Sequence, residues 1–555
     1  MATNADVSAM LAELITLTTL EEESSQSFVV RAYENARLGI EAHGDDITEL
    51  SVGQLTKIKG VGKSTATKIR QYLETGSVDK IDKLRVKYPP PFVELSKIPG
   101  LGPKTLKLLR SELNVEDVEG LKEAIAAEKL RELPRMGAAS EAKIGKAIER
   151  LGLTGKDRRT PIADALPLAE RLVADLLAMP EVTKAAYCGS LRRMSETIGD
   201  IDITVAAVDD GAAAAVMDVV RSHREAVDIV VSGETKTSFL TKTGLQVDVR
   251  VVAPDQFGAA TMYFTGSKAH NIALRQRAID RGALLNEYGL FALDENGDAG
   301  EVIASETETS IYEALDMAYV VPPMREATGE VEAAADGDLP ELVELSHIRG
   351  DLHYHTDRSG DGRSSLADMV AEAAGKGYEY LAITDHGEDL AINGSTAEEM
   401  LEHREAIRAL QPEYPDMTIL YGCELNIGPK GGLDYDADFR ALFDYTVASV
   451  HSSFDASAKD QTKRLVAAIA DPTVNSIGHL TGRYIGRRPG IEIETDIVLE
   501  ALHHFDVALE VNGALQRLDA ASSVVRRAVD RGVKLVINTD SHHVSELGRM
   551  EYGVL

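Results

Sequence analysis

Cysteine and long apolar segments are both scarce in this sequence. The two cysteines, Cys188 and Cys423, lie far apart, and each falls in a strand-like run. We therefore expect no disulfide, which suits a reducing compartment. The sequence contains no run of about 18 apolar residues and no N-terminal apolar segment with basic flanks, so it predicts neither a membrane span nor a signal peptide. These absences predict a cytoplasmic protein with no membrane partner.

Positive charge is also scarce, because 59 lysines and arginines stand against 90 acidic residues, giving a net charge of -31. This balance argues against a generic nucleic-acid binder. Two segments, residues 55–70 and 95–110, nevertheless carry several basic residues and no acid. The excess of aspartate and glutamate in the rest of the chain either repels nucleic acid from other surfaces or reflects a salty cytoplasm. Both interpretations stay open. The length of 555 residues predicts three or four domains.

Residues 1–154 have a helical pattern that contains a repeated glycine turn. The turn occurs in Ile58–Gly62, in Ile98–Gly102 and, in a degenerate form, in Leu133–Gly137. Glycine lets a backbone turn tightly and approach a phosphate, which then faces the N–H groups of the next helix. The repeat resembles the helix-hairpin-helix motif, which holds a DNA backbone without reading its sequence. The predicted DNA contacts are Gly60, Gly62, Lys63, Lys68, Gly100, Gly102 and Lys104. Solvated helix faces are the alternative for the lysines.

Residues 155–320 change to a mixed α/β pattern, with strands predicted at 184–188, 200–206, 227–231 and 245–252. Asp200 and Asp202 are two residues apart and share one strand face, and Asp248 alternates in the same way on a later strand. Such carboxylates repel each other by about 1 kcal/mol per pair even in water. Two Mg²⁺ or Mn²⁺ ions would compensate, and they suit an in-line phosphoryl displacement. The alternative is an edge strand with solvated aspartates.

The surrounding motifs narrow this interpretation. Gly189-Ser190 can hold a triphosphate with Arg193, and a Tyr263–Ser267 segment precedes Asn271 and Arg275. Together with the hairpins, these motifs resemble the family X DNA polymerases, typified by DNA polymerase beta, over residues 1 to about 320. The resemblance implies that Asp200, Asp202 and Asp248 are catalytic and hold the two ions. It also implies that Gly189, Ser190, Arg193, Tyr263, Phe264, Gly266, Asn271 and Arg275 bind the incoming deoxynucleotide. Core packing is the alternative for Tyr263 and Phe264.

The same resemblance offers a second role for Lys68. In the family, a lysine of the N-terminal domain can act as a lyase through a Schiff base, and Lys68 and Tyr33 match that pattern. Phe28-Val29 and Ser64 stand where the family has basic residues. We therefore predict a DNA-phosphate contact for Lys68, with lyase chemistry as the alternative.

Histidines gather in the last part of the chain, where 11 of the 14 follow residue 345. Short apolar strands alternate with helices there, a pattern typical of a parallel α/β barrel. Ligand-type residues follow the strands, at the end where such barrels build active sites. The candidate ligands are His353, His355, Asp361, His386, Glu424, His451, His479, Asp540 and His542. Nine mixed ligands suit three Zn²⁺ or Mn²⁺ ions, which can activate water against a phosphoester.

This pattern resembles the polymerase-and-histidinol-phosphatase (PHP) domain. The resemblance implies three ligand groups: His353, His355, Glu424 and Asp540; Glu424, His451 and His479; and Asp361, His386 and His542. We interpret His347, His503, His504 and His543 as structural or solvated. A degraded scaffold is the alternative for the whole domain. The sequence ends at Leu555, soon after the last candidate ligand, so a closing helix is either short or absent from this sequence.

The predicted fold is a multidomain α plus α/β chain with a helical helix-hairpin-helix region, a nucleotidyltransferase palm with a mixed sheet, and a C-terminal distorted TIM-like barrel. The predicted limits are 1–85 and 86–154 for two helical domains, 155–262 for the palm, 263–324 for the nucleotide-selecting subdomain, 325–345 for an acidic linker and 346–555 for the PHP domain. We expect a monomeric, nucleoid-associated enzyme of DNA repair. It would use deoxynucleoside triphosphates to fill gaps in gapped or nicked DNA, and it would also trim 3′ ends. Cleavage at abasic sites is a further option. The alternatives are a nuclease that uses its palm as a DNA platform and a non-catalytic DNA-end scaffold.

Overall fold

The computed structural model describes residues 4–24, 27–41, 47–48, 50–96, 98, 101–134, 136–151, 159–294, 297–390 and 393–555. The chain divides into two compact units. One contains Met1–Arg159, Ala169–Arg193 and Gly199–Leu339, and the other contains Thr160–Leu168, Met194–Ile198 and Pro340–Leu555. Among the described residues, no helix has the length and apolar character needed to cross a membrane.

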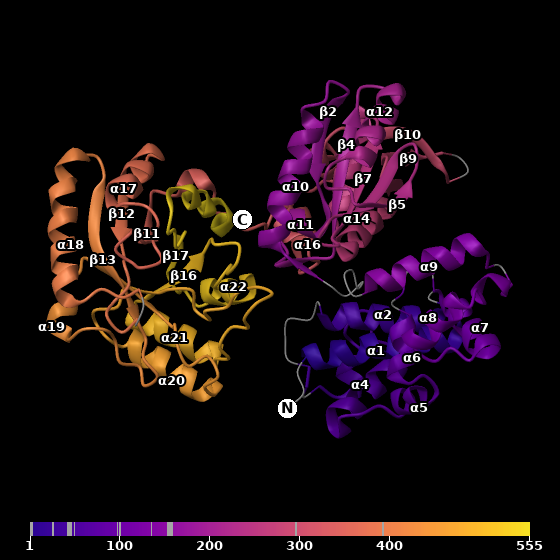
Figure 1. The fold of residues 1–555 in the computed structure, drawn as a ribbon, viewed down its shortest axis with the longest axis horizontal. Helices are drawn as coiled ribbons and strands as arrows, with labels where there is room; N and C mark the ends of the chain where they lie inside the picture. The colour runs from indigo at the N-terminus through magenta and orange to yellow at the C-terminus, as the bar shows by residue number, and fades with distance from the viewer. Residues whose placement is uncertain are drawn as a thin grey trace. The chain divides into compact units, whose positions relative to one another are not determined.

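The N-terminal region is helical, as predicted (Figure 1). One apolar core includes Leu11, Ile40 and Ile69, and a second includes Phe92, Leu106 and Leu121. The helices are α1 (Asn4–Glu22), α2 (Phe28–Glu41), α3 (Val52–Leu55), α4 (Lys63–Thr75), α5 (Asp79–Lys87), α6 (Pro90–Leu95), α7 (Pro103–Leu113), α8 (Val118–Ala126) and α9 (Ala138–Leu151). Each of the two glycine turns leads directly into a helix, α4 or α7, whose first residues are therefore positioned by the turn.

The palm is a five-stranded mixed sheet in the order β2-β4-β7-β6-β5, in which only β4 and β7 run parallel. Its elements are α10 (Ile162–Leu177), β2 (Val182–Tyr187), α11 (Gly189–Arg192), β4 (Asp200–Ala207), α12 (Asp210–Ser222), β5 (Asp228–Ser232), β6 (Lys236–Leu240) and β7 (Gln246–Val252). The four predicted strands are confirmed, and β6 is an additional one. A short pair, β1 (Thr160–Pro161) with β3 (Thr197–Ile198), lies in the other unit.

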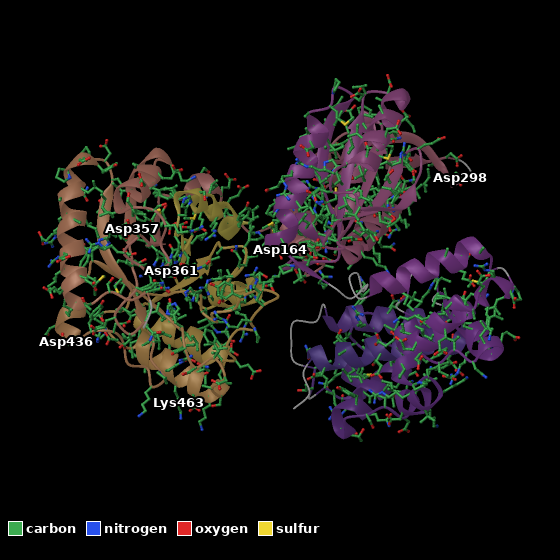
Figure 2. The ribbon with its side chains drawn as sticks, in the orientation of Figure 1. Asp164, Asp298, Asp357, Asp361, Asp436 and Lys463 are labelled. Carbon is green, nitrogen blue, oxygen red and sulfur yellow. The ribbon has the colours of Figure 1, made fainter. Side chains whose placement is uncertain are left out.

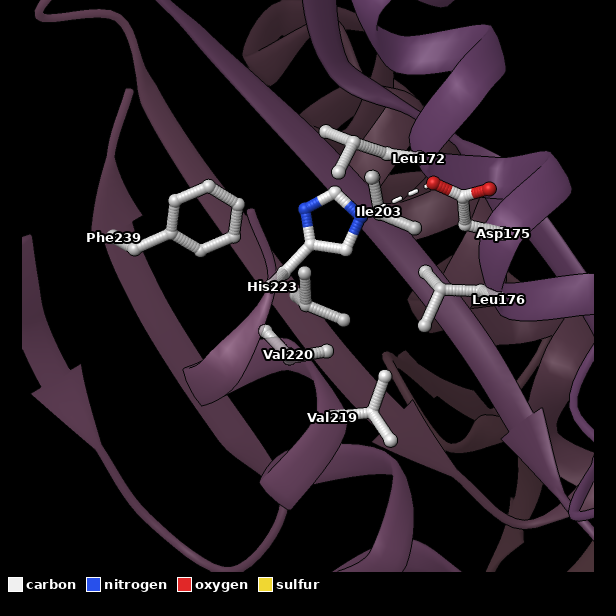
Figure 3. Close-up of a pocket in the computed structure, with 9 residues that line it drawn as sticks. Leu172, Asp175, Leu176, Ile203, Val219, Val220, His223 and Phe239 are labelled. Carbon is white, nitrogen blue, oxygen red and sulfur yellow. Dashed lines mark hydrogen bonds and ion pairs between the residues drawn. The ribbon is translucent and has the colours of Figure 1, made fainter. Parts of the chain in front are cut away.

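One face of the palm sheet is apolar and covered by α10 and α12. Figure 3 shows a small pocket there, where Ile203 of the sheet meets Leu172 of α10 and Val220 of α12. Its one polar pair joins His223 Nε2 to Asp175 Oδ2 at 3.2 Å. Side chains alternate along a strand, so the aspartates Asp202 and Asp248 belong to the opposite face of the sheet.

The next segment packs around its own apolar core, which includes Leu274, Ile311 and Tyr312. Its elements are α13 (Phe257–Thr265), α14 (Lys268–Asp280), β8 (Ala283–Asn286), β9 (Gly289–Leu293), β10 (Ala299–Ala304), α15 (Glu308–Ala314) and α16 (Glu330–Asp336). The predicted acidic linker therefore differs from the structure at its start, because α16 lies within it. Val331 and Ala334, three residues apart on one helix face, join this core.

The C-terminal part is a seven-stranded sheet in sequential order, with every neighbouring pair parallel. A bridge joins Tyr354 of the first strand to Ser541, just after the last strand, so the sheet is a nearly closed barrel. The strands are β11 (Gly350–Tyr354), β12 (Tyr380–Ile383), β13 (Thr418–Asn426), β14 (Tyr445–Ser449), β15 (Ser476–Ile477), β16 (Ala508–Asn512) and β17 (Leu535–Asn538). The helices, several of which run along the outside in Figure 1, are α17 (Leu366–Gly375), α18 (Ala397–Leu410), α19 (Ala437–Arg440), α20 (Ala458–Ile469), α21 (Thr495–Phe505), α22 (Ser522–Asp530) and α23 (Met550–Val554).

Candidate active sites

The three palm aspartates converge on one face of two neighbouring strands. Asp202 lies directly opposite Asp248 in the parallel pairing of β4 with β7, and Asp200 is two residues before Asp202 on the same face. Ile201 and Ile203 are buried on the other face. The alternation predicted from the sequence thus brings all three carboxylates together.

Burial and mutual repulsion act on these carboxylates. Burial, followed by the charges of Asp200 and Asp248, raises the pKa of Asp202 to about 7. The pKa of Asp200 is raised by burial and by Asp248. Burial opposes ionisation of Asp248 as well, but hydrogen bonds from Lys236 and Gln246 lower its pKa. This carboxylate set fits divalent cations such as Mg²⁺, which prefer oxygen ligands and would offset the repulsion.

Lys236 is a member of this site that the sequence did not predict. Its Nζ lies 2.7 Å from Asp248 Oδ2. It comes from β6, where the register aligns Ser238 with Asp248. The short KTSFL segment gave no signal for a strand beside the aspartates, so only the sheet pairing identifies this cation.

The Gly189-Ser190 loop lies against the aspartates. Gly189 has a φ of +64°, and a Cβ there would lie 2.7 Å from Asp202 Oδ2, so only glycine allows this approach. Ser190 follows in α11. Arg193 is the C-cap of α11. Its Nε donates to Glu326 Oε1 at 2.7 Å, and its Nη1 donates to the backbone oxygen of Thr265 at 2.6 Å. The predicted triphosphate partner is therefore already paired with a carboxylate that an anionic ligand would displace.

The predicted nucleotide-selecting residues lie around the end of α13. Tyr263 and Phe264 are half-buried rather than in the core, and their rings meet edge to face. Asn271 Nδ2 donates to the backbone oxygen of Tyr263, and Arg275 Nε donates to the backbone oxygen of Asn271. Gly266 is buried next to Arg193, whose Nη1 would lie 3.4 Å from an added Cβ. The structure thus places Gly266 beside Arg193 and links the other four residues to one another.

The glycines of the hairpins have two different local roles. Gly62 and Gly102 are the N-caps of α4 and α7, and the space where a Cβ would stand is open at both. At Gly60 a Cβ would lie 2.4 Å from the backbone oxygen of Asn35, so this glycine permits packing of the turn on α2. Gly100 lies outside the described residues. The exposed side chains of Lys63 and Lys104 begin the two helices, where a DNA phosphate could approach.

Lys68 lines a pocket together with two further lysines, Lys80 and Lys83. Its Nζ donates to Ser64 Oγ at 2.9 Å and lies 5.7 Å from the centre of the Tyr33 ring. Burial, and then the charge of Lys80, lower the pKa of Lys68. The predicted pair of Lys68 and Tyr33 is therefore adjacent, and the sequence did not identify Lys80 and Lys83.

All nine predicted PHP ligands lie at or after the carboxyl ends of the barrel strands, or in the loop that follows β11. In the view of Figure 2, Asp361 of that loop lies over the middle of the barrel, whereas Asp436 and Lys463 lie at its edge. Every strand except β16 contributes at least one of these ligands at or after its carboxyl end or in the loop that follows, because all strands of a parallel sheet end on the same side. The histidines predicted to be bystanders make other contacts or lie at the surface: His347, His503, His504 and His543.

Glu424 lies at the centre of this cluster. Its Oε2 lies 3.4 Å from His353 Nε2, 3.4 Å from His355 Nε2 and 2.9 Å from His386 Nδ1. Its Oε1 lies 3.2 Å from His451 Nε2 and 3.0 Å from His479 Nε2. One carboxylate therefore faces two different sets of imidazoles, as a bridging ligand would.

The remaining ligands complete the two sides. Asp540 Oδ1 lies 3.3 Å from His355 Nε2 and 3.6 Å from His353 Nε2. Asp361 Oδ2 lies 3.5 Å from both His386 Nε2 and His542 Nε2. Three triads have ligand atoms that lie close enough together to hold an ion: His353, His355 and Asp540; His355, His386 and His542; and His386, Glu424 and His451. The second and third triads differ in part from the predicted groups.

The cluster fits metal ions chemically. Buried His353 Nε2, His355 Nε2 and both Glu424 oxygens contact one another and neighbouring ligands, but none of these atoms forms a hydrogen bond of suitable geometry within the described residues. Buried polar atoms of native proteins nearly always have partners, so these atoms point to bound ions. Burial, with His542 and His386 nearby, lowers the pKa of His355 to about 4. A neutral imidazole at neutral pH is the form that binds a metal.

Glu510 is a further buried residue of this site that sequence reasoning missed. Its carboxylate accepts from His353 Nδ1 at 2.7 Å, from the backbone N–H of His479 at 2.9 Å and from Asn538 Nδ2 at 2.9 Å. It therefore fixes the His353 ring so that Nε2 faces Glu424 and Asp540. The signal was present in the sequence, since Glu510 is the one charged residue of the apolar β16 strand.

Replacing Glu510 with glutamine is expected to weaken metal binding by about 10- to 100-fold, because the neutral amide no longer orients and polarises His353. Titration of the metal-free protein with Zn²⁺ or Mn²⁺ would measure the change. Glu500→Gln, an exposed substitution on α21, is the matched control. Unchanged affinity in Glu510→Gln would show that His353 is held by packing alone.

Comparisons with known protein families agree with this architecture. A helix-hairpin-helix domain profile matches residues 2–78, and a SAM-like helix-hairpin-helix tandem profile matches residues 92–150. A DNA polymerase beta thumb profile matches residues 260–326. A PHP domain profile matches residues 351–514. The predicted helix-hairpin-helix and PHP resemblances are thereby confirmed.

Individual relatives cover the chain to different extents. DNA polymerase/3'-5' exonuclease PolX of Bacillus subtilis is 37% identical over 96% of this chain and 92% of its own length. Rat DNA polymerase lambda is 26% identical over 50% of this chain and 49% of its own length. A probable phosphatase of Caldicellulosiruptor bescii is 27% identical over 36% of this chain and 82% of its own length. The nearly complete match to the first relative shows that this chain belongs to the family X DNA polymerases that carry a C-terminal PHP domain.

Proposed function

We propose that this protein is a DNA-templated polymerase that fills short gaps and a metal-dependent phosphodiesterase that trims 3′ ends during DNA repair. The observation that carries the proposal is the presence of two clusters of candidate metal ligands, the aspartates of the palm and the histidine-rich cluster of the barrel. The relative that matches nearly the whole chain supports it, since that protein is named for both activities. The predicted domain limits stand as part of this proposal, with α16 assigned to the nucleotide-selecting subdomain.

In the palm, Asp200, Asp202 and Asp248 would hold two Mg²⁺ or Mn²⁺ ions, which neutralise charge and activate oxygen when bound. Asp248 would accept the proton of the primer 3′-hydroxyl. Gly189, Ser190 and Arg193 would bind the triphosphate of the deoxynucleotide, with Arg193 released from Glu326. Tyr263 and Phe264 would contact its sugar, and Asn271 and Arg275 would contact the nucleotide and the template.

In the barrel, the nine ligands would hold Zn²⁺ or Mn²⁺ ions, which act as Lewis acids on water and on a phosphate oxygen when bound. Glu424 would connect the two sides of the cluster, and Glu510 would orient His353. The cluster is deeply buried, since Glu424 is only 1% exposed. A single-stranded DNA end would fit such a site better than a duplex would. The proposed substrate is therefore an unpaired or frayed 3′ terminus.

A duplex with a one-nucleotide gap and a 5′-labelled primer tests both activities in one reaction with Mn²⁺. Extension with deoxynucleotides and shortening without them are the expected results. Shortening alone would make the palm a DNA-binding platform. A primer that does not change at all would favour a non-catalytic DNA-end scaffold.

We further propose that the pocket of Lys68, Lys80 and Lys83 binds the 5′-phosphate of a gap. Three cations around one pocket suit a dianion. Lys68→Ala should weaken binding to a 5′-phosphorylated gap by about fivefold or more and leave binding to a 5′-hydroxyl gap unchanged. Fluorescence anisotropy would measure both, with exposed Lys63→Ala as the control for general DNA contact. Equal losses on both gaps would contradict the pocket, and borohydride trapping of Lys68 to an abasic 5′ end would assign the lyase role as well.

A further inference from the structure

Beside the barrel cluster, two arginines and two aromatic rings form one continuous stack. The guanidinium carbon of Arg488 lies 4.0 Å from the centre of the Phe454 ring and 4.9 Å from that of Tyr484. The guanidinium carbon of Arg517 lies 4.4 Å from the same Tyr484 ring. Phe454 follows the ligand His451 by three residues, so the stack is attached to a loop that carries a ligand.

Arg517 reaches the ligand cluster itself. Its Nε lies 3.3 Å from Asp540 Oδ2, and its side chain is 12% exposed. Its Nη1 is buried and has no hydrogen-bond partner among the described residues. A buried guanidinium N–H without an acceptor is costly, so this atom points to an acceptor that is supplied by a ligand.

Arg488 is held without a carboxylate. Its Nε and Nη2 both donate to the backbone oxygen of Gly482, and no ion pair of Arg488 occurs within the described ranges. The positive charges of Arg488 and Arg517 face the same ring, so they repel each other. In a chain with a net charge of -31, acidic partners are abundant, yet Arg488 is positioned by aromatic rings and a backbone oxygen. An anion that contacts both guanidinium groups would relieve the repulsion.

We propose that this stack is a two-phosphate subsite for a nucleic-acid strand, in which Arg517 binds the phosphate that is cleaved and Arg488 binds the next phosphate along the strand. Guanidinium groups suit phosphates because their N–H groups match the oxygens in pairs. Stacking on Phe454 and Tyr484 fixes the planes of the guanidinium groups. Within the described residues, Arg517 Nη1 has no hydrogen-bond partner and so remains available to a ligand. The inference deepens the proposed 3′ trimming and rests on it. A second phosphate contact at Arg488 would make the barrel cluster prefer a polynucleotide to a phosphate ester that contains only one phosphate.

The test compares a 5′-labelled single-stranded oligonucleotide with bis(p-nitrophenyl) phosphate, a diester that contains one phosphorus atom. Arg488→Gln should lower kcat/KM for the oligonucleotide by about tenfold and leave hydrolysis of the small diester unchanged. It should also reduce the slope of log(kcat/KM) against log salt by about 0.7, the value for one phosphate contact on a single strand. Arg517→Gln should lower both reactions by about 100-fold or more.

Arg487→Gln is the matched control, since it removes the same charge from the adjacent, exposed position. It should change the oligonucleotide reaction by less than about twofold. Primer extension by the palm and bound metal content verify that each variant is folded and loaded. Equal effects of Arg487→Gln and Arg488→Gln would overturn the subsite in favour of general electrostatics. Loss of metal in Arg517→Gln would overturn it in favour of a ligand-positioning role.

The proposed 3′ trimming and the proposed phosphate subsite would be contradicted by different results. Wild-type protein that cleaves neither substrate would contradict both the 3′ trimming and the subsite. Wild-type protein that cleaves both, together with unchanged kinetics in Arg488→Gln and Arg517→Gln, would contradict the subsite alone.

Discussion

Primer extension is expected to fall by at least about a thousandfold when Asp200 and Asp202 are both replaced by asparagine, whereas 3′ trimming continues. The substitutions keep the size of the side chains but remove two of the three charges that would hold the ions. Asp202 lies opposite Asp248 in the sheet. In the double variant, Asp248 would therefore be the only one of the three carboxylates left to bind an ion. The gapped-duplex assay measures extension and trimming separately.

The matched control for this pair is Asp255→Asn, an exposed aspartate that follows β7. It should extend primers at the wild-type rate. Loss of both extension and trimming in the double variant, with unchanged thermal unfolding, would contradict the independence of the two sites. Retained extension would mean that the palm aspartates do not hold the catalytic ions.

The reverse result is expected for His353→Ala with His355→Ala, which should abolish 3′ trimming and preserve extension. Both rings are fully buried and face Glu424 and Asp540. Their removal takes ligands from the most enclosed part of the cluster, so bound Zn²⁺ or Mn²⁺ should fall together with trimming. Metal analysis of the purified variant and the trimming assay measure the two effects.

His347→Ala is the corresponding control, because His347 precedes β11 and is exposed. It should retain metal and activity. Trimming that persists in the double variant would show that cleavage occurs elsewhere in the protein. Trimming that disappears while metal content stays constant would assign the two histidines a role other than ion binding.

Local periodicity was sufficient to predict the palm face and the position of the barrel ligands. The alternation in GDIDITV places Asp200 and Asp202 on one face, and the structure has them there. Ligands such as His386 and His479 follow short apolar strands, and parallel pairing brings those strand ends together. Both predictions depend on the spacing of residues that are close together in the sequence, and this spacing can be read from the sequence alone.

Residues that act through long-range contacts could not be predicted in this way. Lys236 reaches Asp248 only through the pairing of β6 with β7. Arg517 reaches Asp540 from a different loop. A charged residue at such a position has the same sequence signature as a solvated one, and only the folded structure distinguishes them.

Composition misled the prediction at one boundary. The acidic residues after Arg325 suggested a linker, but Val331 and Ala334 are spaced for one face of a helix and complete an apolar core. Arg325 itself is fully buried and pairs with Glu308 at 2.7 Å. Two apolar residues on one helix face are therefore enough to pack this segment against the core, although most of its neighbouring residues are acidic or small.

The central position of Glu424 has a consequence for how the barrel cluster fills. One oxygen faces His353, His355 and His386, and the other faces His451 and His479. An ion bound on one side would hold the shared carboxylate in place and thereby prepare the other side. We therefore expect cooperative occupancy, in which a limiting amount of chelator divides the population into fully loaded and fully stripped molecules, with few in between.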